Sequence, residues 1–241
     1  MTLNQASCSQ TAPCPRLRVV AVVLAAGTAS RMGGRPKSLL LREGQTLLAR
    51  LLSKLAQAGI DQTVLVLGHH AQLMQQALQL IPQLKGPDLS RHKGGAPMPL
   101  HVVINPYPEA GQNSSLHLGL ATAQSLQAEW LMVALADQPL IEADDLKALI
   151  AAVKQAPQGT QMLQPSVHGQ PGNPVMFSAK VMDTVLQNPN SGGKAWRQEY
   201  PDTVFDWTST NAHYCIDMDT PDDIAKLAKE HGIELTWGQT S

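Results

Sequence analysis

The sequence of 241 residues has few charged side chains: Asp, Glu, Lys and Arg together make up 15% of it, against about 25% in an average globular protein. The charges also nearly cancel, with 18 Lys and Arg against 19 Asp and Glu and a net charge of −1. A protein that binds nucleic acid irrespective of sequence needs a basic surface, so we do not expect a nucleic-acid partner. Because charges are few, each cluster of them is a candidate for a specific role.

Cysteine and long apolar runs are scarce as well. Cys8, Cys14 and Cys215 are the three cysteines, which make neither a disulfide framework nor a zinc-ligand set. The eight histidines show no metal-binding spacing such as H-E-x-x-H. No uncharged apolar run approaches the length of about 18 residues that spans a bilayer. We therefore expect a cytoplasmic protein with no membrane association and no zinc site.

An alternation of strand-like and helix-like segments fills most of the chain. Short apolar runs predict buried strands at 19–24, 63–68, 100–105 and 129–137. Apolar residues at helical spacing predict helices at 46–59, 70–81, 114–126 and 142–153. Such alternation is typical of right-handed crossovers, so we predict an α/β fold: a three-layer, doubly wound, mostly parallel, Rossmann-like sheet.

The last third of the chain is less regular. Further strands are expected at 162–167, 172–177, 203–206 and 213–216, and further helices at 178–187, 193–199 and 221–231. No composition break is sharp enough to be a linker, and no internal repeat is present. We therefore predict one domain at 18–232.

Three segments are expected to lie outside the core of that domain. Residues 1–17 are rich in Ser, Thr, Gln, Pro and Cys and are interpreted as a disordered tail, and 233–241 as a C-terminal tail. Residues 82–99 hold four prolines and three glycines and are interpreted as a surface insertion. The apolar run after Arg18 also resembles a signal peptide, but the long polar lead-in favours a buried strand.

A glycine-rich, cationic loop follows the first predicted strand. Residues 24–40 have the sequence LAAGTASRMGGRPKSLL, which places Arg31, Arg35 and Lys37 among exposed backbone N–H groups. Such a loop suits a polyphosphate, although a glycine turn with incidental surface cations is the alternative. The loop is neither a P-loop nor a G-x-G-x-x-G motif. The second strand is followed by His69 and not by an acid, which disfavours a dinucleotide-dependent oxidoreductase.

Five motifs resemble, in this order, those of the molybdenum-cofactor cytidylyl- and guanylyltransferases, the MobA-like nucleotidyltransferases with a GT-A-like fold. They are LAAG-x3-RMG-x2-PK from residue 24, NPYPEAGQNSSLHLGL at 105–120, LMVALADQPL at 131–140, GQPGNPVMF at 169–177 and YCIDMDTPDDIAKL at 214–227. The resemblance covers residues 19 to about 230.

The resemblance implies that the first loop wraps a nucleoside triphosphate. The residues expected against the nucleotide are Leu24, Ala25, Ala26, Gly27, Arg31 and Lys37, the last two on the phosphates and also catalytic. Ser114 and Ser115 are expected beside the nucleobase, although at least one of them would equally serve as a helix N-cap.

The resemblance also implies a metal held by Asp137 and Asp219, with Asp137 catalytic as well. Asp137 follows a predicted strand of a parallel sheet, at the edge where such sheets bind ligands. Without the resemblance, both acids would equally be turn or helix-cap residues. Two carboxylates suit Mg²⁺, with Mn²⁺ as a substitute, because such ions prefer oxygen ligands and keep substrate phosphates as further ligands.

The acceptor side departs from the family pattern. In GQPGNP, Asn173 stands where the family usually has histidine, and Asn can hydrogen-bond but cannot take up a proton or carry a charge as histidine can. Asp217 lies two residues before Asp219 and is expected to face the acceptor or the metal's waters. The departure leaves the acceptor open: molybdopterin is favoured, and a sugar or polyol phosphate is the alternative.

Together these observations predict a Mg²⁺-dependent nucleotidyltransferase that moves NMP from an NTP to a phosphorylated acceptor resembling molybdopterin and releases pyrophosphate. The family associates Ala-Ala-Gly, as at 25–27, with CTP, so Ala26 favours CTP over GTP. A molybdoenzyme or its chaperone is the expected protein partner. A non-catalytic nucleotide-binding chaperone of a molybdoenzyme is the alternative from another class.

Overall fold

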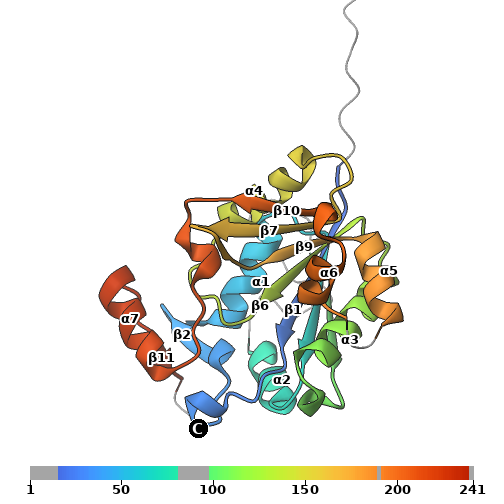
Figure 1. The fold of residues 1–241 in the computed structure, drawn as a ribbon. Helices are drawn as coiled ribbons and strands as arrows, with labels where there is room; N and C mark the ends of the chain where they lie inside the picture. The colour runs from blue at the N-terminus through green and yellow to red at the C-terminus, as the bar shows by residue number, and fades with distance from the viewer. Residues whose placement is uncertain (1–15, 81–97, 189–190, 239–241) are drawn as a thin grey trace, which may run out of the picture.

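The computed structural model of the protein describes residues 16–80, 98–188 and 191–238 (Figure 1). Most of the expected N-terminal tail and most of the insertion expected at 82–99 lie outside these residues. No helix in the described ranges is both long and apolar enough to cross a membrane.

A mixed, mostly parallel sheet forms the centre of the fold. Its strands are β1 (Val19–Ala25), β4 (Gln62–Leu67), β5 (Leu100–Ile104), β6 (Trp130–Leu135), β7 (Met162–Val167), β8 (Gln170–Pro171), β9 (Val175–Ser178) and β10 (Val204–Thr208). They lie in the order β10-β7-β9-β6-β1-β4-β5, and β8 pairs with β7. Neighbouring strands are parallel except that β9 is antiparallel to both β6 and β7, and β8 to β7.

The apolar run of β1 forms a strand because both of its faces are covered. Residues 19–23 are at most 1% exposed. Val22 pairs in register with Val64 of β4 on one side and Val133 of β6 on the other. A parallel strand buried between two helical layers has no polar face, which explains the continuous apolar sequence.

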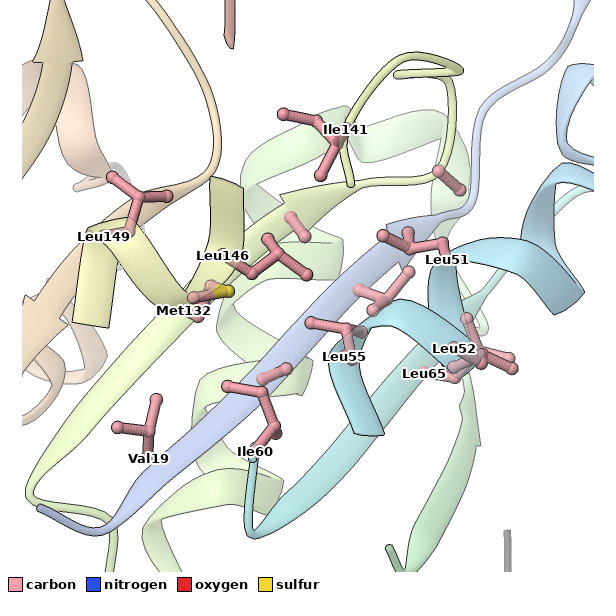
Figure 2. Close-up of a cluster of buried hydrophobic side chains, with 14 of the residues drawn as sticks. Val19, Leu51, Leu52, Leu55, Ile60, Leu65, Met132, Ile141, Leu146 and Leu149 are labelled. Atoms are coloured by element: carbon pink, nitrogen blue, oxygen red, sulfur yellow. The ribbon is translucent and has the colours of Figure 1, made fainter. Parts of the chain in front are cut away.

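Helices cover both faces of the sheet, which confirms the predicted three-layer, doubly wound α/β architecture. One face carries α1 (Leu47–Gln57), α2 (Ala71–Gln79) and α4 (Ala143–Gln155), and the other carries α3 (Gln112–Gln124), α5 (Ala179–Gln187) and α6 (Gly193–Glu199). Figure 1 shows α1 and α3 on opposite sides of β1. Figure 2 shows the first layer, where Leu51 and Leu55 of α1 and Leu146 of α4 lie over the strand that begins at Val19.

A second, smaller sheet lies beside the last helix. It consists of β2 (Leu40–Arg42), β3 (Gln45–Thr46) and β11 (Thr236–Trp237), in the order β11-β2-β3. Helix α7 (Pro221–His231) begins with a capping box between Thr220 and Asp223 and is followed by Ile233, which is only 6% exposed. The interpretation of 233–241 as a tail is therefore wrong for residues 233–237, which pack and pair.

Two local predictions differ from the structure. The strand expected at 213–216 is a 3-10 helix, Ala212–Cys215, because the Asn211 side chain accepts a hydrogen bond from the His213 N–H and starts a turn. Helix α3 begins at Gln112 after Gly111, so Ser114 and Ser115 lie in its first turn and neither is its N-cap.

Candidate active site

A cavity of about 300 Å³ lies at the carboxyl ends of β1 and β6. These two strands are parallel neighbours, and the chain leaves β1 toward β4 on one side before it returns to β6 on the other. Open parallel sheets bind ligands in the crevice at such a switch point. The cavity is lined by Leu24, Ala25, Gly27, Thr28, Ala29, Ser30, Arg31, Met32, Pro36, Lys37, Ser38, Ala136, Asp137 and Asp219.

Lys37 joins two carboxylates at this edge of the sheet. Its Nζ donates to Asp137 Oδ2 at 2.8 Å and to Asp219 Oδ1 at 2.7 Å. The other oxygen of Asp219 accepts from the Arg31 guanidinium at 3.2 Å. Residues that lie a hundred or more positions apart in the sequence therefore form one charged cluster.

Backbone contacts explain why the two acids meet. Asp137 lies two residues after the end of β6, and the N–H of the intervening Ala136 donates to Leu24 O of β1 at 3.3 Å. The Met218 N–H donates to Asp137 O at 3.1 Å, which holds the segment before α7 against the end of β6. The N–H of Asp219 donates to the Asp223 carboxylate at 2.9 Å, so the start of α7 fixes the backbone of this acid.

The first loop is shaped by left-handed backbone and by a buried methionine. Ala29, Gly33 and Gly34 have φ values of 54°, 64° and 75°, and the N–H groups of Met32 and Gly34 both donate to Ala29 O. Met32 is 6% exposed and packs with Met218 and Leu227. The methionine thus anchors the loop, whereas the side chain of Arg31 is 70% exposed.

The charge of Lys37 is stabilised by its partners. Burial favours the neutral amine, but the charges and hydrogen bonds of Asp137 and Asp219 outweigh it and hold the pKa of Lys37 above its ordinary value. Partial burial and the same two carboxylates raise the pKa of Asp217, the third acid at this edge. At neutral pH the cluster therefore contains a firmly protonated lysine.

The acids offer oxygen ligands that suit a divalent metal. Oδ1 of Asp137 is buried and has no hydrogen-bond partner among the described residues, so a hard cation would satisfy it. Across the same residues no group of three His, Cys, Asp or Glu side chains gathers as a metal site. Two carboxylates with substrate phosphates as further ligands fit Mg²⁺, which seldom relies on protein ligands alone.

Comparison with known proteins places this chain in a family. Residues 21–204 match the family described as the MobA-like NTP transferase domain. The chain belongs to the MobA-like NTP transferases. This confirms the family that the five sequence motifs resemble.

Two curated relatives of this MobA-like chain have different printed activities. It is 34% identical over 148 residues to the 2-C-methyl-D-erythritol 4-phosphate cytidylyltransferase of Shewanella oneidensis. The aligned region covers 61% of this chain and 52% of that protein. It is 28% identical over 135 residues to the molybdenum cofactor guanylyltransferase of Vibrio atlanticus, covering 56% of each. The matched region thus spans about half the length of these two relatives.

Solved structures match over more of the chain. The crystal structure of Rv0371c from Mycobacterium tuberculosis superimposes with a TM-score of 0.66 and 25% identity over 90% of this chain and 100% of that one. A complex of Rv0371c with manganese gives a TM-score of 0.60, at 24% identity over 88% of this chain and 99% of that one. These likenesses support the α/β fold.

The structure gathers most of the nucleotide and metal residues expected from the family resemblance. Those that line the first cavity are Leu24, Ala25, Gly27, Arg31, Lys37, Asp137 and Asp219. Ala26 does not line it and lies against Gly68, where an added Cβ would come within 2.7 Å of the Ala26 Cβ. Arg35, expected near the phosphates, lies instead over the ring of Trp237 at 4.1 Å.

The remaining expected site residues lie elsewhere in this MobA-like fold. Ser114 and Ser115 line neither cavity, and their hydroxyls accept hydrogen bonds from the Asn105 amide at 2.8 and 2.9 Å. Asn173 lines a second cavity of about 630 Å³, which shares Leu24 with the first. Asp217 lines neither cavity, although partial burial and the charges of Asp137 and Asp219 raise its pKa.

Sequence reasoning did not anticipate the second cavity. Its polar lining includes Asn113, Gln164, Lys194 and Arg197, which come from α3, β7 and α6. The double glycine at 192–193 was the one local signal, because it permits close packing of α6 against the sheet.

Proposed function

We propose that the protein is a Mg²⁺-dependent nucleotidyltransferase that moves NMP from an NTP to a phosphorylated acceptor and releases pyrophosphate. The observation that carries the proposal is the position of Lys37 between Asp137 and Asp219 at the switch point of the sheet, beside a glycine-rich loop. This arrangement combines cations for a triphosphate with carboxylates for a metal, in one cavity.

The loop and its cations hold the triphosphate in this proposal. Backbone around Gly27 contacts the nucleotide, and Lys37 and Arg31 bind phosphate oxygens. An oxygen of the acceptor phosphate forms a bond to the α-phosphorus while the bond from that phosphorus to the bridging oxygen of pyrophosphate breaks. The acceptor oxygen is already ionised, so no general base is needed. Lys37 and Arg31 stabilise the charge that moves onto the leaving pyrophosphate.

Asp137 and Asp219 would hold the Mg²⁺ ion. The bound ion supplies charge neutralisation to the triphosphate and the leaving pyrophosphate. Mn²⁺ is the expected substitute, and the manganese complex of Rv0371c supports a divalent ion for this fold. We further propose that residues 18–237 form one cytoplasmic catalytic domain, because the site draws on residues from Leu24 to Asp219.

CTP is the proposed nucleotide and a molybdopterin-like molecule is the proposed acceptor. The guanylyltransferase of Vibrio atlanticus supports the link to the molybdenum cofactor, and the Ala-Ala-Gly sequence at 25–27 supports CTP. The Shewanella relative is named for a polyol phosphate, which keeps that class as the second candidate. A molybdoenzyme or its chaperone would receive the nucleotidylated product.

The test follows pyrophosphate release from pure protein with Mg²⁺, each NTP in turn, and molybdopterin or a polyol phosphate as acceptor. We expect release with CTP and molybdopterin. Asp137→Ala should reduce turnover by ~10²–10³-fold, the scale of losing one charge-stabilising group, while the far-UV circular dichroism stays unchanged. Asp144→Ala is the matched control, because this acid is 90% exposed on α4. Absence of pyrophosphate with every NTP and acceptor would refute the proposal.

A further inference from the structure

Arg35 is a further cation of the glycine-rich loop, and it has no carboxylate partner among the described residues. Its side chain is exposed, and its guanidinium carbon lies 4.1 Å from the centroid of the Trp237 ring. A cation–π contact at an exposed site changes an equilibrium constant only about two- to fivefold. The charge of Arg35 is therefore held weakly and is not neutralised.

The aromatic ring beside Arg35 belongs to the last strand, β11. Trp237 pairs with Leu40 of β2, and its side chain packs against the buried cluster that contains Met32 and Leu40. Figure 1 shows β11 beside β2. The fold of the C-terminal segment thus fixes the position of the ring.

The loop around Arg35 leaves room for its side chain to turn. Gly33 and Gly34 have φ values of 64° and 75°, and no atom lies within 4 Å of a Cβ added at either residue. The Arg35 N–H donates to Met32 O at 3.3 Å, which is long for a backbone hydrogen bond. The ring is therefore anchored more firmly than the arginine that lies over it.

Arg35 lies between residues of the first cavity. Arg31 and Met32 before it and Pro36 and Lys37 after it line that cavity, whereas Arg35 does not. A rotation of this long side chain away from the ring can therefore bring a cation to the mouth of the cavity.

The lining of the first cavity has no net positive charge for a triphosphate. Asp137 and Asp219 balance Lys37 and Arg31. A triphosphate remains anionic when it carries one Mg²⁺, so a further cation gains a charge-assisted hydrogen bond from it. Such a bond is worth at least about tenfold in affinity, which exceeds the two- to fivefold effect of the ring contact.

We propose that Arg35 rests on Trp237 while no nucleotide is bound and moves onto the triphosphate when a nucleotide enters. Trp237 is then a positioning residue that lowers nucleotide affinity, because it holds a cation that the triphosphate must draw away. Arg35 occupies one of the two variable positions of RMG-x2-PK, and Trp237 lies outside all five motifs, so the pair is a feature of this chain. The inference rests on the proposed function and adds two residues to it.

Titration calorimetry of the full chain with inorganic triphosphate and Mg²⁺ measures the effect of each residue. Arg35→Gln should weaken binding about tenfold, because a charge-assisted hydrogen bond is lost. Trp237→Leu should strengthen binding about two- to fivefold, because leucine keeps an apolar side chain but releases the cation. The double variant should bind as Arg35→Gln does, since the ring then has no cation to hold.

Two variants serve as controls in this titration. Trp237→Tyr keeps an aromatic face and should bind the probe as the wild type does. Arg18→Gln removes an exposed arginine at the amino end of β1, away from the carboxyl end where the cavity lies, and should leave the affinity unchanged. Far-UV circular dichroism confirms that each variant is folded.

Tryptophan fluorescence gives a second readout that does not depend on affinity. Saturating triphosphate should change the emission of the wild-type protein, because the guanidinium leaves the indole ring. The other three tryptophans, Trp130, Trp196 and Trp207, do not line the first cavity. The change should therefore be absent from both Arg35→Gln and Trp237→Tyr.

Equal or weaker binding in Trp237→Leu would overturn the inference, because the ring would then support the loop and not withhold a cation. Unchanged affinity in Arg35→Gln, an emission change that persists in Arg35→Gln, or no binding of the probe to the wild type would overturn it as well. The titration contains no NTP and no acceptor, so its failure leaves the proposed function to its own assay. Failure of pyrophosphate release with every NTP and acceptor overturns the proposed function instead.

Discussion

Replacement of Lys37 by methionine tests the charged cluster most directly. Methionine keeps an unbranched apolar chain but removes the ammonium that donates to Asp137 and Asp219 at 2.8 and 2.7 Å. The two carboxylates are then left close together, and among the described residues only the exposed Arg31 remains as a cationic partner of Asp219. We therefore expect Lys37→Met to destabilise the metal-free protein.

The exposure of the three side chains sets the magnitude. Lys37, Asp137 and Asp219 are 19%, 25% and 47% exposed. Exposed ion pairs contribute about 0.2–1 kcal/mol, whereas removing one partner of a buried pair costs about 3–5 kcal/mol. The loss of the partly buried double ion pair of Lys37 should cost a free energy between these two values, about 1–3 kcal/mol. Because the pKa of Lys37 is raised, its contribution is fully present at neutral pH and is lost only as the pH rises through that pKa.

Added Mg²⁺ should reverse this loss in the variant. Without Lys37, the oxygens of Asp137 and Asp219 are free to bind the ion, and binding at a hundred times the dissociation constant stabilises a protein by about 2.7 kcal/mol. In the wild-type protein the ion must compete with the ammonium, so the same Mg²⁺ concentration should stabilise it less. When an NTP is also present, its phosphates can bind the Lys37 ammonium in place of the carboxylates. Mg²⁺ should then stabilise the wild-type protein further.

Urea unfolding followed by circular dichroism, with and without Mg²⁺, measures these free energies. Lys147→Met is the matched control: Lys147 also donates to an aspartate at 2.8 Å, but the side chains of Lys147 and Asp144 are 53% and 90% exposed. This control should lose less than about 1 kcal/mol and should respond to Mg²⁺ as the wild type does. The reasoning fails if Lys37→Met is as stable as the wild type, or if Mg²⁺ stabilises both proteins equally.

Two further predictions concern the segments that hold the acids. Gly172→Ala should destabilise the protein by about 1–3 kcal/mol in urea unfolding, because the new Cβ would lie 2.6 Å from the backbone oxygen of Tyr214. Gly27→Ala is the stability control, because no atom lies within 4 Å of its new Cβ. Equal losses of stability in the two variants would contradict the steric argument. Asp217→Asn should stabilise the metal-free protein by up to about 0.5 kcal/mol at pH 7, because partial burial and nearby carboxylates raise the pKa of Asp217. Since a raised carboxyl pKa penalises only the ionised form, this gain should disappear as the pH falls below about 4, and a gain that is constant with pH would contradict it.

The central strands β1, β4 and β6 of the main sheet were predictable because they are buried on both faces and have continuous apolar sequences. The small sheet of β2, β3 and β11 was not, because its strands have only two or three residues and pair Leu40 and Leu41 with Trp237 and Thr236 at the far end of the chain. The segment at 213–216 looked like a strand from its apolar residues. There the Asn211 side chain starts a turn, and the Tyr214 hydroxyl donates to Asp145 O at 2.8 Å.

The candidate site was predictable to different degrees on its two sides. The motifs singled out Lys37, Asp137 and Asp219 individually, but only the fold shows that one ammonium joins both carboxylates. The hydroxyls of Ser114 and Ser115 are engaged by Asn105, a contact that no local pattern reveals. The second cavity combines residues of β6, β7, β9, α3 and α6, so its lining could not be inferred from any single segment.

The two cavities divide charge between them in a way that the near-neutral composition conceals. At the first, Asp137 and Asp219 balance Lys37 and Arg31, so the lining has no net charge. A triphosphate without a metal therefore gains no net attraction there, whereas one that arrives with Mg²⁺ brings a further cation for the two carboxylates. The lining of the second cavity contains Lys194 and Arg197 and no acidic side chain, so an anion needs no metal there. Metal dependence should therefore belong to nucleotide binding at the first cavity.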